Sequence, residues 1–154
     1  MNKESSWACP EEGQAINMIK STDETILVIT PEPTSIMDAY SLIKIMDDNS
    51  FRKKINLVVN QTTSEQEGDN VSQRFETVVK KFLDFKIRTI GYVPYDIKVI
   101  RAVKSKKPFT ILYPRSKVSR SVADIADILL KNKEEKKSSG VADFFNKLAG
   151  IFST

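Results

Sequence analysis

The chain contains no histidine, one cysteine and only five glycines in 154 residues. Without histidine it cannot build a Ser-His-Asp triad, a Cys-His pair or a metal site that depends on imidazole. The single cysteine, Cys9, excludes an internal disulfide, a thiolate zinc site and an iron–sulfur cluster. The glycines are too widely spaced for a GxGxxG or GxxxxGK[ST] loop, so the chain has no phosphate-binding loop of its own. We therefore expect no catalytic residues and no metal ligands.

Long hydrophobic runs are also missing. No stretch approaches the roughly 18 apolar residues that a membrane-spanning helix needs. The first residues, Met1 to Trp7, lack the apolar segment of a secretory signal, so we expect a cytoplasmic protein. The net charge of +4 favours anionic partners without choosing between nucleic acid and lipid.

Three short apolar runs predict strands that are buried on both faces, as in parallel sheets: Thr25–Thr30, Ile55–Asn60 and Ile87–Val93. Helical spacing of apolar residues predicts helices over 11–20, 36–46, 71–82, 97–103 and 118–130. Ser35 is placed to cap the second helix, residues 62–70 are expected to form a loop, and 108–114 are expected to be extended. This alternation predicts an α/β fold with a parallel sheet and flanking helices, and a ligand crevice beyond the carboxyl ends of the strands.

Composition divides the chain into four parts. Residues 1–10 are polar and patternless and are expected to be a disordered leader, and residues 11–130 hold the α/β domain. Residues 131–140 form a charged linker, and residues 141–154 are expected to form an amphipathic helix.

One apolar stripe defines this C-terminal segment. It consists of Val141, Phe144, Phe145, Leu148, Ile151 and Phe152, at helical spacing. A short, bulky-apolar helix behind a lysine-bearing tether is typical of a helix that lies in a membrane interface. Packing back onto the protein body or into a partner's groove is the alternative.

Five segments in chain order resemble the MinD/ParA family of deviant Walker ATPases. They are Ile26–Tyr40 with the form TPEPTSI-x-DAY, Leu57–Asn60, Ile90–Asp96, Ala102–Phe109, and Pro114–Ser121 with the form P-x-S-x-x-S. The first resembles most closely the branch that regulates flagellar number, and the amphipathic tail is similar to the membrane-targeting helix of the family. The resemblance covers the C-terminal half of such an ATPase.

The Gly-rich Walker loop of the family is absent, so the resemblance implies an incomplete P-loop NTPase domain of MinD/ParA type. It also implies that Asn60, Pro94 and Asp96 line the adenine end of the nucleotide pocket. Without the triphosphate contacts we expect weak ATP binding at most, no bound magnesium and no hydrolysis by this chain alone, although the family is one of ATPases. The alternative from the residues themselves is that Asn60 caps a loop and Pro94 ends a strand.

The resemblance implies a regulator of flagellar number or placement that acts at the inner face of the cytoplasmic membrane by binding partners. Those partners would be the membrane surface, flagellar-assembly proteins such as the flagellar GTPase or switch components, and a second copy or complementing half. The alternatives are the C-terminal part of an ATP-binding ATPase that is whole only with its other half, and a cell-division-site or partitioning protein.

Two further features leave alternatives open. The cations Lys98, Arg101, Lys104, Lys106, Lys107, Arg115, Lys117 and Arg120 form either an ordinary solvated face or a surface for DNA or lipid. Nucleic acid is not the expected partner, because no aromatic platform is interleaved with them. Strands suited to the centre of a sheet would also leave an exposed apolar edge if half of the sheet is absent.

Overall fold

The computed structural model of the chain describes residues 19, 22, 24–50, 54–83 and 85–131. The chain divides into two compact units, Met1–Tyr92 and Val93–Thr154. The leader over 1–10, most of the helix predicted over 11–20 and the C-terminal segment 141–154 lie outside the described residues. Among the described helices, none has the length and hydrophobicity to cross a membrane.

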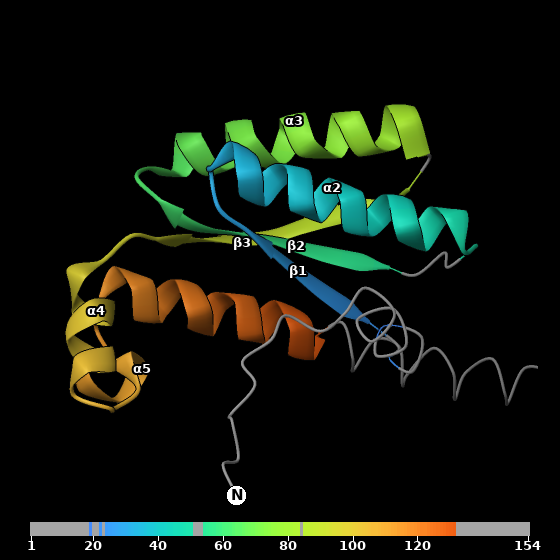
Figure 1. Cartoon of the computed structure of the whole chain (residues 1–154). Coiled ribbons are helices and arrows are strands. Elements are labelled where there is room, and N and C mark those ends of the chain that lie inside the picture. The colour runs from blue at the N-terminus through green and yellow to red at the C-terminus, as the bar shows by residue number, and fades with distance from the viewer. Residues whose placement is uncertain (1–18, 20–21, 23, 51–53, 84, 132–154) are drawn as a thin grey trace, which may run out of the picture. The chain divides into compact units, whose positions relative to one another are not determined.

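Three parallel strands build the sheet, as predicted. They are β1 (Thr25–Ile29), β2 (Ile55–Thr62) and β3 (Ile87–Pro94), in the order β1-β2-β3 (Figure 1). β1 pairs with β2 in parallel, with Leu27 opposite Leu57. Because β2 is the central strand, its first five residues are all buried, which explains its continuous apolar sequence.

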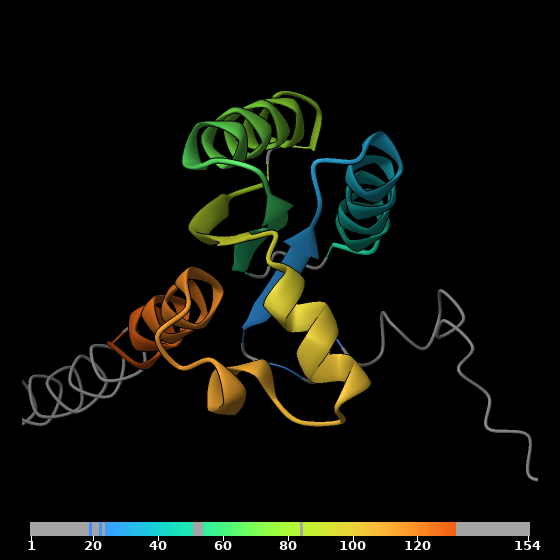
Figure 2. The same ribbon diagram turned by 90° about the vertical axis from the view of Figure 1, so that its left-hand side faces the viewer.

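Two helices cover one face of the sheet. α2 (Pro33–Asp48) and α3 (Glu65–Leu83) lie side by side on it (Figures 1 and 2). The core lies between these helices and the sheet and consists of Ile29, Ala39, Ile43, Met46, Ile55, Leu57, Val59, Phe75, Val79, Leu83 and Phe85. Burial of these side chains supplies the main driving force for folding of this unit.

The prediction that every strand is buried on both faces is wrong for β1. Ile26 and Val28, on the face turned away from the helices, are 48% and 56% exposed. Thr25 donates its N–H to the Lys54 carbonyl, next to β2. Because successive backbone N–H groups of a strand point to opposite sides, the N–H groups of Ile26 and Val28 point toward the open edge of the sheet. β1 is therefore an uncovered edge strand with an apolar outer face.

Asn56 is an unusual residue of the central strand. It is fully buried opposite Ile26, and neither its Oδ1 nor its Nδ2 has a hydrogen-bond partner among the described residues. Such a buried amide costs about 1–3 kcal/mol relative to a satisfied one.

Both helices of the first unit begin differently from the prediction. α2 starts at Pro33, and the Ser35 hydroxyl does not cap it but accepts the N–H of Thr30 at 3.0 Å. α3 starts at Glu65 rather than Val71, so most of the expected loop is helical. The reason is that Ser64 accepts the N–H of Glu67 and starts the helix within a polar sequence.

Two side-chain links join α3 to β3. Tyr92 donates its hydroxyl to Asp69 at 2.6 Å, and its ring lies against the bare backbone of Gly68. Glu76 accepts both the N–H and the hydroxyl of Thr89. The amide of Thr89 is thereby occupied, whereas no side chain of the described residues caps the outward amides of β1 in this way.

The second unit contains short helices. α4 (Ile97–Lys104) confirms the prediction for 97–103, and α5 (Phe109–Leu112) shows that the segment between the two prolines is helical, not extended. A further helix covers 117–131. Ser116 caps it by accepting the N–H of Ser119, and the buried hydroxyls of Ser116 and Ser119 both donate to the Tyr113 carbonyl.

Candidate functional site

A polar cavity of about 380 Å³ lies where β1 and β2 end, the position predicted for the ligand crevice. It is lined by Pro31, Ser64, Gln66, Glu67, Asn70, Val71 and Arg74. Pro31 follows β1, Ser64 directly precedes α3, and the other residues lie in the first half of α3. Arg74 and Glu67 give the cavity one cation and one carboxylate.

Glu67 is held by the backbone at the mouth of this cavity. Its Oε2 accepts the N–H of Thr63 at 2.6 Å and the Thr63 hydroxyl at 2.8 Å. The backbone bond, followed by the hydroxyl bond, lowers the pKa of Glu67 below its usual 4.5. The carboxylate therefore serves to start α3.

Asn60, the first of the predicted adenine-binding residues, lies near the end of β2. Its Oδ1 accepts the N–H of Gln61 at 2.9 Å, and Gln61 has a positive φ of 60°. This bond matches the loop-capping alternative for Asn60. The Nδ2 group has no hydrogen bond among the described residues and is available as a donor.

Pro94 and Asp96 come together in the second unit at the junction of β3 and α4. Pro94 is the last residue of β3, and Asp96 is the N-cap of α4, whose Oδ1 accepts the N–H of Lys98 at 2.9 Å. The structure thus gives both residues a local role, and the carboxylate of Asp96 is already engaged by its helix.

An apolar groove of about 660 Å³ lies between α2 and α3 and is larger than the polar cavity. Its lining is apolar except for Arg74 and consists of Pro31, Pro33, Ile36, Met37, Tyr40, Val71, Arg74, Phe75, Val78 and Phe82. Pro31, Val71 and Arg74 also line the polar cavity, so the two are adjacent. Met37 and Phe82 are 61% and 65% exposed.

The apolar residues whose helical spacing predicted a helix over 71–82 form one stripe that includes Val78 and Phe82. The structure divides this stripe, because Phe75, Val79 and Leu83 enter the core while Val78 and Phe82 face the groove. The sequence carried no separate signal for the groove, because a stripe of this width is typical of an ordinary core-facing helix. Only the position of α2 shows which side of that stripe stays uncovered.

Both the sequence and the fold of the chain resemble those of known proteins. No protein-family profile matches the chain. It is 33% identical over 111 residues to the antiactivator FleN of Pseudomonas aeruginosa, covering 72% of this chain and 40% of FleN. It is 27% identical over 135 residues to the flagellum site-determining protein YlxH of Helicobacter pylori, covering 84% of this chain and 45% of YlxH.

A solved structure shares the fold. The MinC:MinD cell division protein complex of Aquifex aeolicus matches with a TM-score of 0.58 and 23% identity over 80% of this chain and 48% of the matched chain. The resemblance to the MinD/ParA-type ATPases is confirmed. The MinD-like chain has a partial P-loop NTPase α/β fold and spans less than half the length of these relatives.

Proposed function

We propose that this MinD/ParA-like chain regulates flagellar number or placement by binding partner proteins at the inner face of the cytoplasmic membrane. The similarity to FleN and to the flagellum site-determining protein YlxH supports the flagellar role. The apolar groove between α2 and α3 carries the proposal of partner binding. An amphipathic helix that lays three or four apolar side chains into such a groove is a common mode of recognition.

Binding through the groove is testable with purified proteins. Substitution of Phe82→Glu places a charge in the apolar lining and should abolish binding to the flagellar GTPase or switch components of the same organism. Leu130→Glu changes a similarly exposed apolar residue, in the second unit, and serves as the matched control. Equal binding of both variants, measured by titration calorimetry, would contradict a role for the groove.

Membrane association is assigned to the C-terminal segment with Val141, Phe144, Phe145, Leu148, Ile151 and Phe152. Each apolar side chain gains roughly 1.5–3 kcal/mol on burial, and ordering the short helix offsets much of this, so we expect weak and reversible binding. Removal of residues 132–154 should reduce binding to uncharged phosphatidylcholine vesicles to background in a flotation assay. Unchanged flotation after the deletion would refute the assignment and favour a tail that packs on protein.

We also propose weak ATP binding through Asn60, Pro94 and Asp96. The free Nδ2 of Asn60 supports this, because an amide donor can pair with the edge of a base. Asn60→Ala should lower the affinity for a fluorescent ATP analogue several-fold and leave the circular dichroism unchanged. Asn49→Ala, at the far end of α2, is the control. The engaged carboxylate of Asp96 limits that residue to backbone contacts with the ring.

A second candidate function is a contribution to an ATPase assembled from two halves. The open edge of β1 favours it, since Ile26 and Val28 present an apolar face and unpaired backbone to another strand. The test is to add a separately produced segment of a relative that carries the Walker loop and to measure complex formation and phosphate release. If no complex forms, partner binding by the chain alone remains the proposal.

A further inference from the structure

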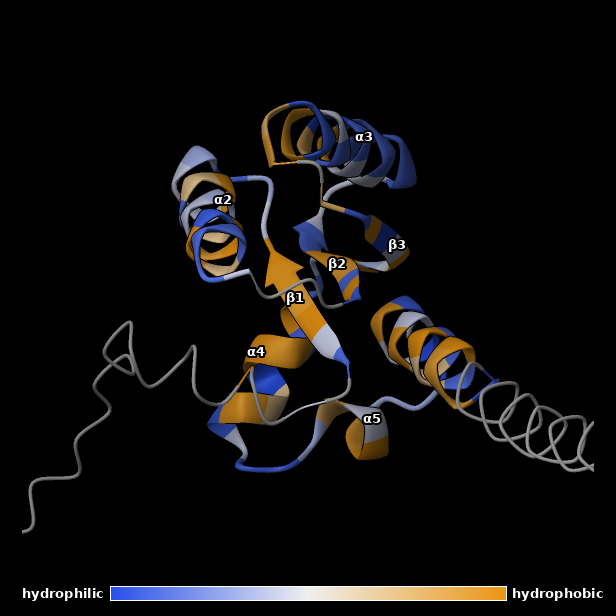
Figure 3. Cartoon of the chain, turned by 90° about the vertical axis from the view of Figure 1, so that its right-hand side faces the viewer, coloured by the Kyte–Doolittle hydropathy of each residue, from blue (hydrophilic) through white to orange (hydrophobic). Residues whose placement is uncertain are grey.

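The second unit carries a surface that neither the nucleotide nor the groove proposal uses. On α4, Ile97, Ile100 and Val103 recur every three residues and are all exposed. Val103 is 70% exposed, and Ile111 on α5 is 72% exposed. Figure 3 shows hydrophobic residues alternating with hydrophilic ones on α4, and mainly hydrophobic residues on α5. We define these four apolar residues and the cations around them as the α4–α5 surface.

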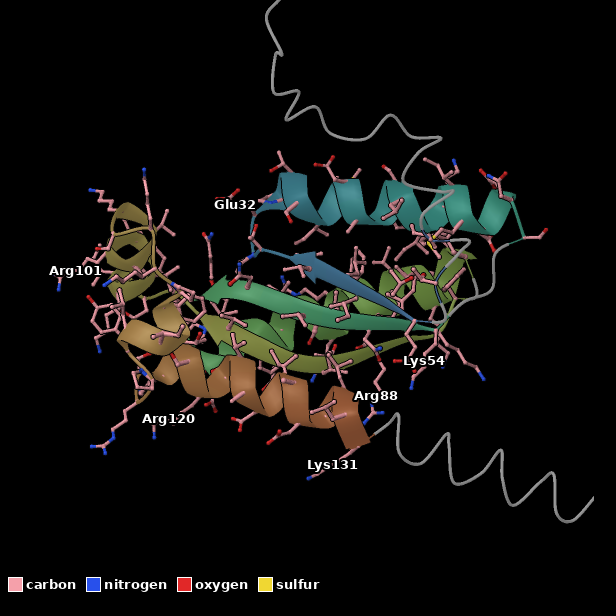
Figure 4. All side chains as sticks on the ribbon, turned by 90° about the horizontal axis from the view of Figure 1, so that it is seen from below. Glu32, Lys54, Arg88, Arg101, Arg120 and Lys131 are labelled. Carbon is pink, nitrogen blue, oxygen red and sulfur yellow. The ribbon has the colours of Figure 1, made fainter. Side chains whose placement is uncertain are left out.

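Its charge has one sign only. Residues 97–120 contain eight Lys and Arg residues and no Asp or Glu. These cations form no ion pair with the described residues, so their charge is not neutralised within that part of the chain. Arg101 and Lys104 flank the apolar stripe on α4, and Figure 4 shows Arg101 and Arg120 extending outward from their helices.

The turn after α4 adds a lysine where a glycine would fit better. Lys106 has a φ of 52°, in the left-handed region that costs non-glycine residues energy. Its N–H donates to Val103 and that of Lys107 to Ala102, so the turn is closed around these two exposed lysines. A glycine would adopt this turn without strain, and the lysine therefore supplies charge at a small cost in stability.

We propose that the α4–α5 surface is a second membrane-contact site that binds anionic lipid headgroups and inserts its apolar residues among them. Apolar side chains interleaved with unpaired cations match both layers of an anionic membrane surface, the charged headgroups and the apolar boundary below them. Duplex DNA would use the cations but would leave Ile97, Ile100, Val103 and Ile111 facing water. The surface extends the proposed membrane association to a site independent of the tail.

The charge component is tested by flotation with phosphatidylcholine vesicles that contain or lack phosphatidylglycerol. Arg101→Gln with Lys104→Gln should lower partitioning onto the anionic vesicles roughly thirtyfold at low salt, from about 1 kcal/mol for each cation. Lys106→Gly should lower it about fivefold while the unfolding temperature is unchanged or higher. A purely structural role for Lys106 would leave partitioning unchanged, which would overturn the proposal.

The apolar component separates lipid from nucleic acid. Val103→Ser with Ile111→Ser should weaken binding to anionic vesicles and leave binding to duplex DNA, measured by fluorescence anisotropy in the same buffer, unchanged. If only the charge variants matter, and they weaken DNA and vesicles alike, the surface is a general electrostatic face and the proposal fails.

The proposals for the tail and for the α4–α5 surface can be tested independently of each other. Phe144→Ser with Phe145→Ser removes tail insertion and should leave the salt-sensitive binding to anionic vesicles in place. If that variant loses all vesicle binding, the tail alone carries membrane association and the α4–α5 surface does not. If it loses none on either vesicle, the tail proposal fails instead.

Discussion

At the scale of single residues, the contact between Gly68 and Tyr92 shows how one glycine positions a helix. A Cβ built on Gly68 would lie 2.6 Å from the Cδ1 atom of the Tyr92 ring, and that ring is anchored through its hydroxyl to Asp69 and Ser72. Burial of the hydroxyl, together with its bond to Asp69, raises the pKa of Tyr92. α3 can therefore approach β3 closely only without a side chain at position 68.

The effect of Gly68→Ala on the free energy of unfolding should change sign when Tyr92 is removed. In the natural chain we expect a loss of about 1–2 kcal/mol in the free energy of unfolding, because overpacking outweighs the better helix propensity of alanine. In a Tyr92→Ala background the same change should stabilise by up to about 1 kcal/mol. Urea unfolding of the four chains measures both values, and the same sign in both backgrounds would refute the contact.

Asn56 should be replaceable with a gain in stability. Its buried amide lacks a partner among the described residues, so Asn56→Leu exchanges an unsatisfied polar group for an apolar one of similar size. We expect the free energy of unfolding to rise by about 1–2 kcal/mol. A thermal shift assay would reveal it, and a destabilised variant would mean that the amide has a partner outside the described residues.

Glu67 should contribute a pH-dependent part of the stability. Because its folded pKa is lowered, the contribution is complete above about pH 4.5 and is lost as the pH falls through the folded pKa. Between neutral pH and pH 3, the unfolding temperature should fall less in Glu67→Gln than in the natural chain. Glu65→Gln, in the same helical turn, is the control and should retain the full fall.

At the scale of elements, the two edges of the sheet differ. Along β3, Glu76 occupies the Thr89 amide, whereas β1 exposes both apolar side chains and unpaired backbone. Edges of this kind pair with other strands unless a charge or a covering element prevents it. The sequence predicted such an edge, and the structure assigns it to β1.

Val28→Lys should therefore reduce self-association of the purified chain. A lysine on the exposed face of an edge strand disfavours pairing with a second strand. Sedimentation velocity over a concentration series should show less dimer and aggregate than for the natural chain. Leu130→Lys removes an equally exposed apolar residue from a helix and should have a smaller effect; equal effects would point to general hydrophobicity.

At the scale of the whole molecule, the chain consists of two compact units and spans less than half the length of FleN and YlxH. The strand ends provide an amide donor at Asn60 and a polar cavity, and the sequence contains no Gly-rich loop to hold a triphosphate. Phosphoryl transfer depends almost entirely on positioning and charge at the phosphates. We therefore expect this chain to bind nucleotide weakly without hydrolysing it.

We expect the purified chain to release no phosphate from ATP above the buffer background, even where a fluorescent analogue binds weakly. A malachite-green assay on the full chain measures this. Turnover that follows the chain through purification and disappears in Asn60→Ala would contradict the prediction and would favour the ATPase alternative.

The sequence by itself determined the chain order of the three strands and of α2, α3 and α4, and the absence of a phosphate loop, whereas it missed α5. Short β-branched apolar runs such as 55–60 are typical of buried parallel strands, and glycine spacing is a property of the chain alone. The start of α3 was missed because the hydrogen bonds of Ser64 and Glu67 compete with a polar, loop-like composition.

Only the tertiary structure decided which apolar residues are covered. Ile26, Val28, Val78 and Phe82 follow the same periodicities as core residues, and they are exposed because no described element covers the outer face of β1 or the groove between α2 and α3. Periodicity records which side chains share a face, whereas burial depends on what packs against that face. The same holds for α4. Its cations and its apolar stripe are visible in the sequence, but only the structure shows that the stripe is exposed.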